Sequence, residues 1–164
     1  MDRFVRNVRL VTALVLVMIL AAGIAFGRQH RAAEARAEAG AYAVSARSND
    51  YVLLARIVAG EAAGEPYVGQ VAVAAVILNR VKSPKFPNTI AEVIYQPGAF
   101  ESVSNGQIWA RYPSRTNFKA AQDALNGWDP TYGSLFFWNP SKRVNPWIWT
   151  RRIITQIGDH VFGK

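Results

Sequence analysis

Few side chains in the C-terminal two thirds of the sequence could transfer a proton. Residues 51–164 contain seven carboxylates, which are Glu61, Glu65, Glu92, Glu101, Asp123, Asp129 and Asp159. Three of them have structural explanations: Glu92 fits a helix-capping pattern, Asp123 an exposed helix face, and Asp129 an Asp-Pro turn. Glu61 has no comparable explanation, so it is the first candidate for chemistry.

Glu61 shares a predicted helix face with apolar residues. That face follows i, i+3, i+4, i+7 spacing and consists of Tyr51, Leu54, Ala55, Val58, Glu61 and Ala62. The neighbours of Glu61 are small, so a ligand or another backbone can come close. Apolar surroundings disfavour the ionised form of a carboxyl, and a carboxyl that keeps its proton can act as a general acid. An ion pair with Arg56 or Arg80 would explain an inward carboxylate equally well.

Other kinds of catalytic site find little support in these residues. The chain has no cysteine, which excludes disulfides, thiolate metal sites and a cysteine nucleophile. His160 is the single histidine after residue 50, so a histidine-rich zinc site is not expected, and we predict a packed side chain. No phosphate loop or dinucleotide fingerprint occurs. We therefore expect neither a metal nor a cofactor.

The elements that must position Glu61 are predicted from periodicity and turn residues. Helices are predicted from Tyr51, over 67–81 with Pro66 at its start, from a Thr89/Glu92 capping box to Tyr95, and over 116–126. Residues 99–115 have little periodicity and are predicted to form a long binding loop. Short strands are expected at 134–138, 147–149 and 160–162. Helices followed by strands indicate an α+β fold.

The N-terminal third has a different character. Residues 10–27 carry no charge and follow Arg3, Arg6 and Arg9, as in a transmembrane anchor or a signal peptide. Residues 28–49, rich in Ala, Arg and Glu, are predicted to be a stalk, with Ser48, Asn49 or Asp50 capping the next helix. The domains are thus an anchor or signal (1–27), a stalk (28–49) and a folded unit (50–164). We expect that unit to be exported.

Charge and aromatic content suggest what the folded unit binds. The whole chain has a formal charge of +8, and residues 51–164 hold 12 basic and 7 acidic residues, a difference of +5. Aromatic side chains are numerous, and this mixture suits stacking on sugar rings or on single-stranded nucleic acid. For an exported domain an anionic wall polymer is the better partner, so no nucleic acid is expected.

Four blocks of the sequence resemble the SleB/CwlJ family of spore-cortex cell-wall hydrolases. They are LLARIVAGEAAGEPYVGQVAVAAVILNRV (53–81), FPNTIAEVIYQPGAFESVSNGQIW (86–109), AAQDALNGWDPTYGSLFFWNP (120–140) and the ending IGDHVFGK. The resemblance implies a lysozyme-like α+β domain with a small antiparallel sheet, which cleaves peptidoglycan glycan strands during germination, in some members as a lytic transglycosylase. It also implies that the acid of the A-x-x-x-x-G-E-A-x-G-E motif is Glu61.

The mechanism and the remaining site residues follow from this resemblance as expectations. A hydrolase needs a second carboxylate, for which Glu65 or Asp159 are candidates, whereas a lytic transglycosylase needs none. The shortage of unexplained carboxylates favours the transglycosylase, acting at the MurNAc-GlcNAc bond. Candidate substrate-binding residues are Gln70, Asn79, Phe100, Ser104, Asn105, Trp138 and Asn139. Asn79 and Glu65 have alternative roles in pinning or capping helices.

One departure from the family pattern concerns a strand that often reads Y-F-Y-N-P. Here it reads Phe136-Phe137-Trp138-Asn139-Pro140, so a tyrosine hydroxyl would have to come from Tyr95, Tyr112 or Tyr132. Two other functions stay open, a membrane-tethered module that binds peptidoglycan without cleaving it and a basic nucleic-acid binder. Whether a partner protein regulates the chain is also left open.

Overall fold

The computed structural model describes the backbone of residues 2–164 and the side chains of residues 23–25, 27–41, 43, 45 and 47–164. The chain divides into two units, Met1–Ala46 and Arg47–Lys164. Helix α1 (Asp2–Glu61) contributes residues to both. In the first unit every side chain that the structure describes is exposed.

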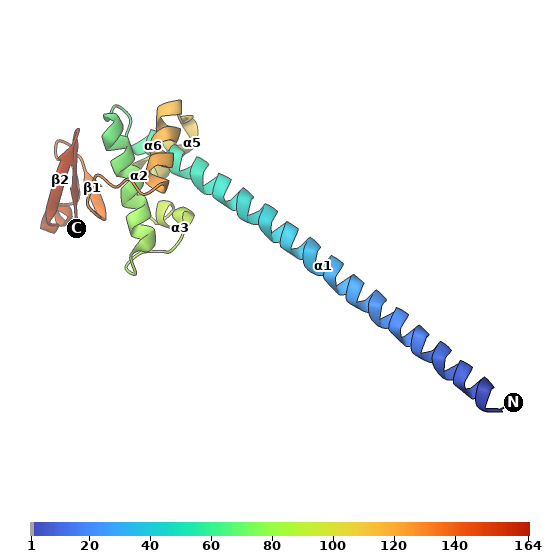
Figure 1. Ribbon diagram of the computed structural model, residues 1–164. Helices are drawn as coiled ribbons and strands as arrows, with labels where there is room; N and C mark the ends of the chain where they lie inside the picture. Colours follow the sequence, from blue (N-terminus) through green and yellow to red (C-terminus); the bar gives the residue numbers. More distant parts are fainter. Residues whose placement is uncertain (1) are drawn as a thin grey trace. The chain divides into compact units, whose positions relative to one another are not determined.

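The second unit contains five further α-helices, one 3-10 helix and three strands. The helices are α2 (Tyr67–Lys82), α3 (Ile90–Ile94), α4 (Glu101–Ser104), α5 (Gln107–Ala110), α6 (Arg115–Leu125) and the 3-10 helix η1 (Pro146–Thr150). The strands are β1 (Phe136–Trp138), β2 (Ile153–Ile157) and β3 (His160–Gly163). Figure 1 shows the strands grouped at one side of the helices.

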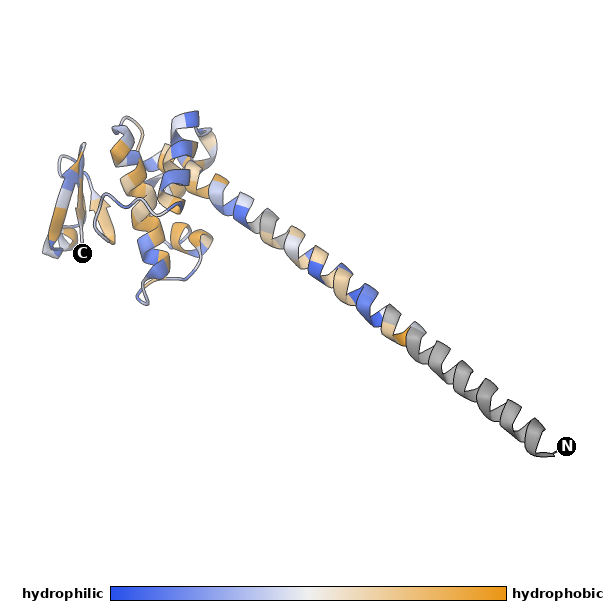
Figure 2. Cartoon of the chain, viewed as in Figure 1, coloured by the Kyte–Doolittle hydropathy of each residue, from blue (hydrophilic) through white to orange (hydrophobic). Residues whose placement is uncertain are grey.

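Helix α2 is the centre of this unit. It packs against α6 and α3 and also contacts β1 and β2, and it lies between the sheet and α6 (Figure 1). Residues 71–77 are all buried, and the helix is coloured as predominantly hydrophobic in Figure 2. A helix covered on several sides needs apolar residues all round rather than a single stripe, and that is what this sequence supplies. The main core also includes Leu54, Ile57 and Val58 from the end of α1.

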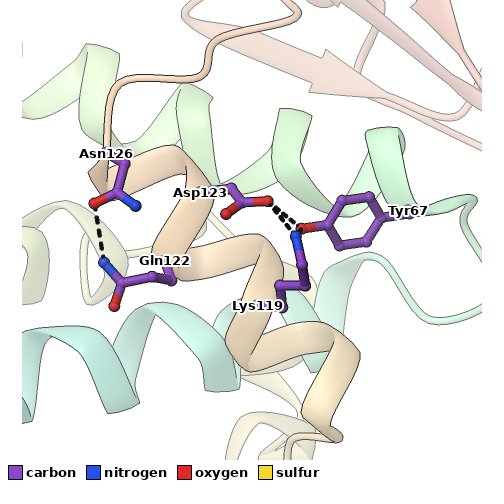
Figure 3. Close-up of polar contacts among 5 residues, drawn as sticks. All are labelled: Tyr67, Lys119, Gln122, Asp123 and Asn126. Carbon is purple, nitrogen blue, oxygen red and sulfur yellow. Dashed lines mark hydrogen bonds and ion pairs between the residues drawn. The ribbon is translucent and has the colours of Figure 1, made fainter.

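A polar cluster joins α2 to α6 at the surface. The Tyr67 hydroxyl donates a hydrogen bond of 2.5 Å to Oδ2 of Asp123, and Lys119 Nζ lies 2.7 Å from the same oxygen (Figure 3). Lys119 and Asp123 are one turn apart on α6 and form an ion pair, and Lys119 Nζ also donates to the Tyr67 hydroxyl oxygen at 3.0 Å. Desolvation and the hydrogen bond to the Asp123 carboxylate raise the pKa of Tyr67.

The three strands form an antiparallel sheet in the order β1-β3-β2. β3 is central and buried throughout, with Phe162 packed against Ala72 and Val76 of α2. An irregularity between Ile153 and Thr155 interrupts the pairing of β2 with β3. The sheet thereby anchors the chain's last residues to the central helix, which fixes His160 beside the cavity described below.

Several element predictions need correction. Residues 48–50 are helical within α1, so none of them caps a new helix. The stretch 147–149 forms η1 instead of a strand, because Asn145 caps it and Pro146 occupies its first position. Residues 99–115 contain α4 and α5, and β2 is an additional strand. The helices at 67–81, 90–95 and 116–126 are confirmed within about two residues, and Thr89 caps α3 as predicted.

The predicted anchor or signal segment falls largely outside the described side chains, because residues 1–22 and 26 are not among them. Within the part of the chain that the structure describes, no helix combines the length and the apolar character needed to cross a membrane.

Candidate active site

Glu61 is the last residue of α1 and lines a cavity of about 340 Å³ in the second unit. The other walls come from Arg80 of α2, the start of α4, the strand β1 with the turn after it, and His160 of β3. The lining residues are Gly60, Glu61, Arg80, Ala99, Phe100, Glu101, Ser102, Gln107, Phe137, Trp138, Asn139, Lys142, Arg143, Val144 and His160. The volume lies within the range of about 300–1,000 Å³ that is typical of small-ligand sites.

One oxygen of Glu61 is held by the backbone of α4. The N–H of Ser102 donates a hydrogen bond of 2.8 Å to Glu61 Oε1. This contact depends on Gly60, because a Cβ at that position would lie 2.6 Å from both Cβ and Oγ of Ser102. The glycine before the glutamate therefore lets α4 approach α1 closely enough to fix the carboxylate.

Neither arginine predicted as an alternative partner forms an ion pair with Glu61. Arg56 donates from Nη1 to the carbonyl oxygen of Ile108 at 3.4 Å and lies over the ring of Trp109. Arg80 donates from Nε to the carbonyl oxygen of Leu135 at 2.8 Å. Among the described residues, no cation lies within ion-pair distance of Glu61. The carboxylate thus faces the cavity instead of being neutralised within the fold.

Arg80 is a buried cation that lines the same cavity as Glu61. Burial lowers the pKa of Arg80 to about 10, and the carboxylate of Glu61 acts in the opposite direction. The guanidinium stays charged at neutral pH and lies about 5–6 Å from the rings of Phe86, Phe100 and Phe136. It gives the cavity a fixed positive charge.

His160, which lines the cavity, is paired with Glu65, which does not line it. His160 Nδ1 lies 3.5 Å from Glu65 Oε1, and the ring packs edge-on against Phe137. Burial lowers the pKa of His160, although Glu65 and Glu61 both raise it. Glu65 is held by the Asp159 N–H at 3.1 Å from Oε2, which ties the loop before α2 to the β2–β3 turn.

The predicted substrate-binding residues divide into two groups. Phe100, Trp138 and Asn139 line the cavity together with Glu61. The other four do not line it and bond within the protein. Gln70 donates to the Glu65 carbonyl oxygen, Asn79 to Asp129 Oδ2 and the Ser134 carbonyl oxygen, and Ser104 to the Phe100 carbonyl oxygen, while Asn105 accepts from the Gln107 N–H. Asn79 thus pins α2 to the turn before β1.

Sequence reasoning missed several cavity residues. Glu101 is exposed and lines the cavity beside Glu61, whereas Glu65 and Asp159, the predicted second carboxylates, do not. Lys142 and Arg143 bring further positive charge. The available signal for Glu101 was its position in the predicted binding loop 99–115. Tyr95, Tyr112 and Tyr132 are exposed and line no part of this cavity, so none of them supplies a hydroxyl there.

The fold and the site together describe a small α+β protein in which a glutamate faces a cation-lined cavity. Residues 64–163 match the Cell Wall Hydrolase family, and the match begins three residues after Glu61. The chain belongs to this family.

Individual relatives agree with this assignment. The spore cortex-lytic enzyme of Bacillus cereus is 55% identical over 116 residues, which cover 71% of this chain and 44% of that enzyme. The chain thus matches less than half the length of this relative. The crystal structure of the catalytic domain of the Bacillus cereus SleB protein is similar with a TM-score of 0.67 at 55% identity, covering 71% of this chain and 91% of that domain.

A second solved structure is equally similar. The catalytic domain of the germination-specific lytic transglycosylase SleB from Bacillus anthracis has a TM-score of 0.67 and 54% identity, and the match covers 71% of this chain and 94% of that domain. The family and the helical fold with its small antiparallel sheet are therefore as the sequence predicted.

Proposed function

We propose that this protein cleaves the glycan strands of peptidoglycan at the MurNAc-GlcNAc bond as a lytic transglycosylase, with spore cortex as its substrate during germination. The observation that carries the proposal is Glu61, whose Oε1 is fixed by the Ser102 N–H while its carboxylate faces a cavity. The names of the relatives support the choice of cortex and of transglycosylase chemistry.

The geometry suits a proton transfer that reverses direction. Protonated Glu61 gives its proton to the glycosidic oxygen, the bond from C1 to that oxygen breaks, and an oxocarbenium-like centre develops at C1. Glu61, now ionised, accepts the proton of the muramic C6 hydroxyl, whose oxygen attacks C1 and closes a 1,6-anhydro ring. Water is not consumed, and Glu61 ends the cycle protonated.

The charges around the cavity fit an anionic glycan. Arg80, Lys142 and Arg143 line it against two carboxylates, Glu61 and Glu101. Muramic acid carries a lactyl group that is a carboxylate or is amide-linked, and both forms accept hydrogen bonds from arginine and lysine. A cavity lined by three cations therefore favours muramyl residues over a neutral sugar polymer.

A second candidate function is a hydrolase that uses Glu101. Its presence in the cavity supplies the second carboxylate that an ordinary glycosidase needs, about 5–5.5 Å from the acid in retaining enzymes and about 6.5–9.5 Å in inverting ones. In that case water replaces the C6 hydroxyl, and the products have reducing ends.

Mass spectrometry of muropeptides released from purified cortex tests these alternatives. We expect products one water lighter than hydrolysis products from the wild type and from Glu101→Gln, and none from Glu61→Gln. Reducing-end products that disappear in Glu101→Gln would establish the hydrolase. If the wild type binds cortex but releases nothing, the chain is a binding module.

We also propose that residues 10–27 act as a membrane anchor or an export signal. The support is the uncharged run after Arg3, Arg6 and Arg9. Membrane fractionation with N-terminal sequencing tests it: a retained N-terminus in the membrane fraction indicates an anchor, and a shortened one in the soluble exported fraction indicates a signal.

A further inference from the structure

A second cavity adjoins the one that holds Glu61. It also has a volume of about 340 Å³ and is lined by Arg80, Phe86, Gln96, Pro97, Gly98, Ala99, Phe136, Phe137, Trp147 and Ile148. Three of these residues, Arg80, Ala99 and Phe137, line the first cavity as well. The two cavities are therefore neighbours that share a wall.

The shared wall holds a fixed hydrogen-bond donor. Arg80 is buried, and its Nε donates to the Leu135 carbonyl oxygen at 2.8 Å. Its guanidinium carbon lies 5.1 Å from the ring centroid of Phe100 in the first cavity and 5.7 Å from that of Phe136 in the second. Among the described residues, no protein group accepts a hydrogen bond from its two terminal nitrogens. They can therefore donate to an oxygen of a ligand that crosses from one cavity to the other.

The lining of the second cavity suits an uncharged ring. It has no carboxylate and no lysine, and its aromatic side chains are Phe86, Phe136, Phe137 and Trp147. Trp147 is 46% exposed, its ring meets Phe136 edge-on at 5.5 Å, and the Arg151 guanidinium lies 5.3 Å from its centroid. Contacts from two neighbours hold the indole in place while almost half of its surface stays open to a ligand.

We propose that this second cavity is a further sugar-binding subsite, in which Trp147 stacks on the apolar face of a pyranose belonging to the same glycan strand that Glu61 attacks. The proposal rests on the proposed function, because that function defines the ligand as a glycan long enough to pass the Arg80 wall. Binding energy gained in this subsite holds the strand in register at the scissile bond.

Trp149 offers a matched control for Trp147. Both belong to η1, Trp149 is 51% exposed, and it meets Trp138 edge-on at 5.7 Å much as Trp147 meets Phe136. Trp149 lines neither cavity. Trp147→Ala and Trp149→Ala therefore each remove one exposed tryptophan from η1. Only Trp147→Ala removes the ring proposed to stack on the sugar.

The experiment measures binding of peptide-free GlcNAc-MurNAc hexasaccharide by calorimetry in the full chain carrying Glu61→Gln, so that no cleavage is required. We expect Trp147→Ala to weaken binding about tenfold, as for truncation of an aromatic anchor, and Trp149→Ala to change it less than about twofold. Trp147→Phe, which keeps an aromatic face, should recover most of the affinity even if the alanine variant is poorly folded.

The proposal is overturned if the hexasaccharide does not bind, if Trp147→Ala leaves the affinity unchanged in a folded protein, or if both alanine variants lower it equally. Failure of the proposed function has a different signature. A chain with Glu61 intact that binds the hexasaccharide through Trp147 but releases no product retains the subsite and loses only the catalytic assignment.

Discussion

At the scale of single residues, the site depends on a backbone contact that only a glycine permits. Gly60 precedes Glu61, and the space that its missing Cβ leaves is filled by Ser102, whose N–H holds the carboxylate. A helix would otherwise favour alanine over glycine by about 1 kcal/mol. Gly60 therefore lowers the stability of α1, but it allows the backbone of α4 to position the Glu61 carboxylate.

Gly60→Ala tests this contact. The added Cβ must push α4 away, so we expect cortex-degrading activity to fall at least about tenfold, the scale of a displaced catalytic group. Ser102→Gly removes the clashing side chain while keeping the backbone donor, so the double variant should regain most of the activity. Equal activity in wild type and Gly60→Ala would contradict the role given to this glycine.

His160 makes a second prediction at this scale. Because burial lowers its pKa below the ordinary value of 6.5, the folded protein binds fewer protons than the unfolded chain as the pH falls from that value toward the folded pKa. The contribution of His160 to the free energy of unfolding is therefore complete above about pH 6.5 and declines below it. Glu65, Glu61 and Asp159 oppose the shift and Lys142 adds to it.

The measurement is the melting temperature of wild type and His160→Gln between about pH 7.5 and pH 5, a range that spans the ordinary histidine pKa. We expect the wild type to lose more stability over this range than the variant, which lacks the titrating ring. If the melting temperatures of both proteins fall in parallel as the pH decreases, a group other than His160 causes the loss of stability in acid.

At the scale of elements, the protein depends on the attachment of α6 and the sheet to α2. The Tyr67–Asp123–Lys119 cluster fastens one end of α2 to α6 (Figure 3), and Asn79 fastens the other end to the turn before β1. Hydrogen bonds from Lys119 and Tyr67 lower the pKa of the Asp123 carboxyl.

Tyr67→Phe removes the hydroxyl but keeps the ring against Trp128. We expect a loss of about 1 kcal/mol in the free energy of unfolding, the usual value of one such hydrogen bond. Tyr132→Phe is the matched control, because Tyr132 is 74% exposed and should tolerate loss of its hydroxyl. Denaturant unfolding of both variants checks the difference, and equal losses would argue against a stabilising role of the Tyr67–Asp123 hydrogen bond.

At the scale of the whole molecule, all buried apolar residues of the three core clusters lie between Leu54 and Phe162. The first unit adds exposed side chains wherever they are described. The apolar burial that the structure describes therefore lies in the second unit, and the described side chains before it add little to it.

A fragment of residues 49–164 should consequently be soluble and cooperatively folded, and it should keep the proposed activity. Its melting temperature should lie within about 2 °C of that of the full chain, the shift expected for a free-energy change well below 1 kcal/mol. Calorimetry of both proteins is the check. An insoluble fragment beside a well-behaved full chain would show that the preceding residues are part of the folding unit.

The sequence by itself determined the elements whose signals are local. Glu61 was singled out because helical periodicity places a charge among apolar residues, Thr89 and Glu92 mark a helix start, and the four motif blocks identified the family. Each of these signals is carried by neighbours in the chain, where propensity and capping act directly.

Only the tertiary structure decided which distant groups meet at the site. Ser102 reaches Glu61 across 41 residues of chain, and Glu101 comes from the same helix as Ser102. Arg80 and His160 come from two further elements, α2 and β3. Asn79 and Gln70 have residue types suited to a ligand, but their partners lie within the fold. The type of a side chain limits which groups it can hydrogen-bond to. Which of these groups lies within reach is decided by tertiary packing between elements far apart in the sequence, so it cannot be inferred from the spacing of residues.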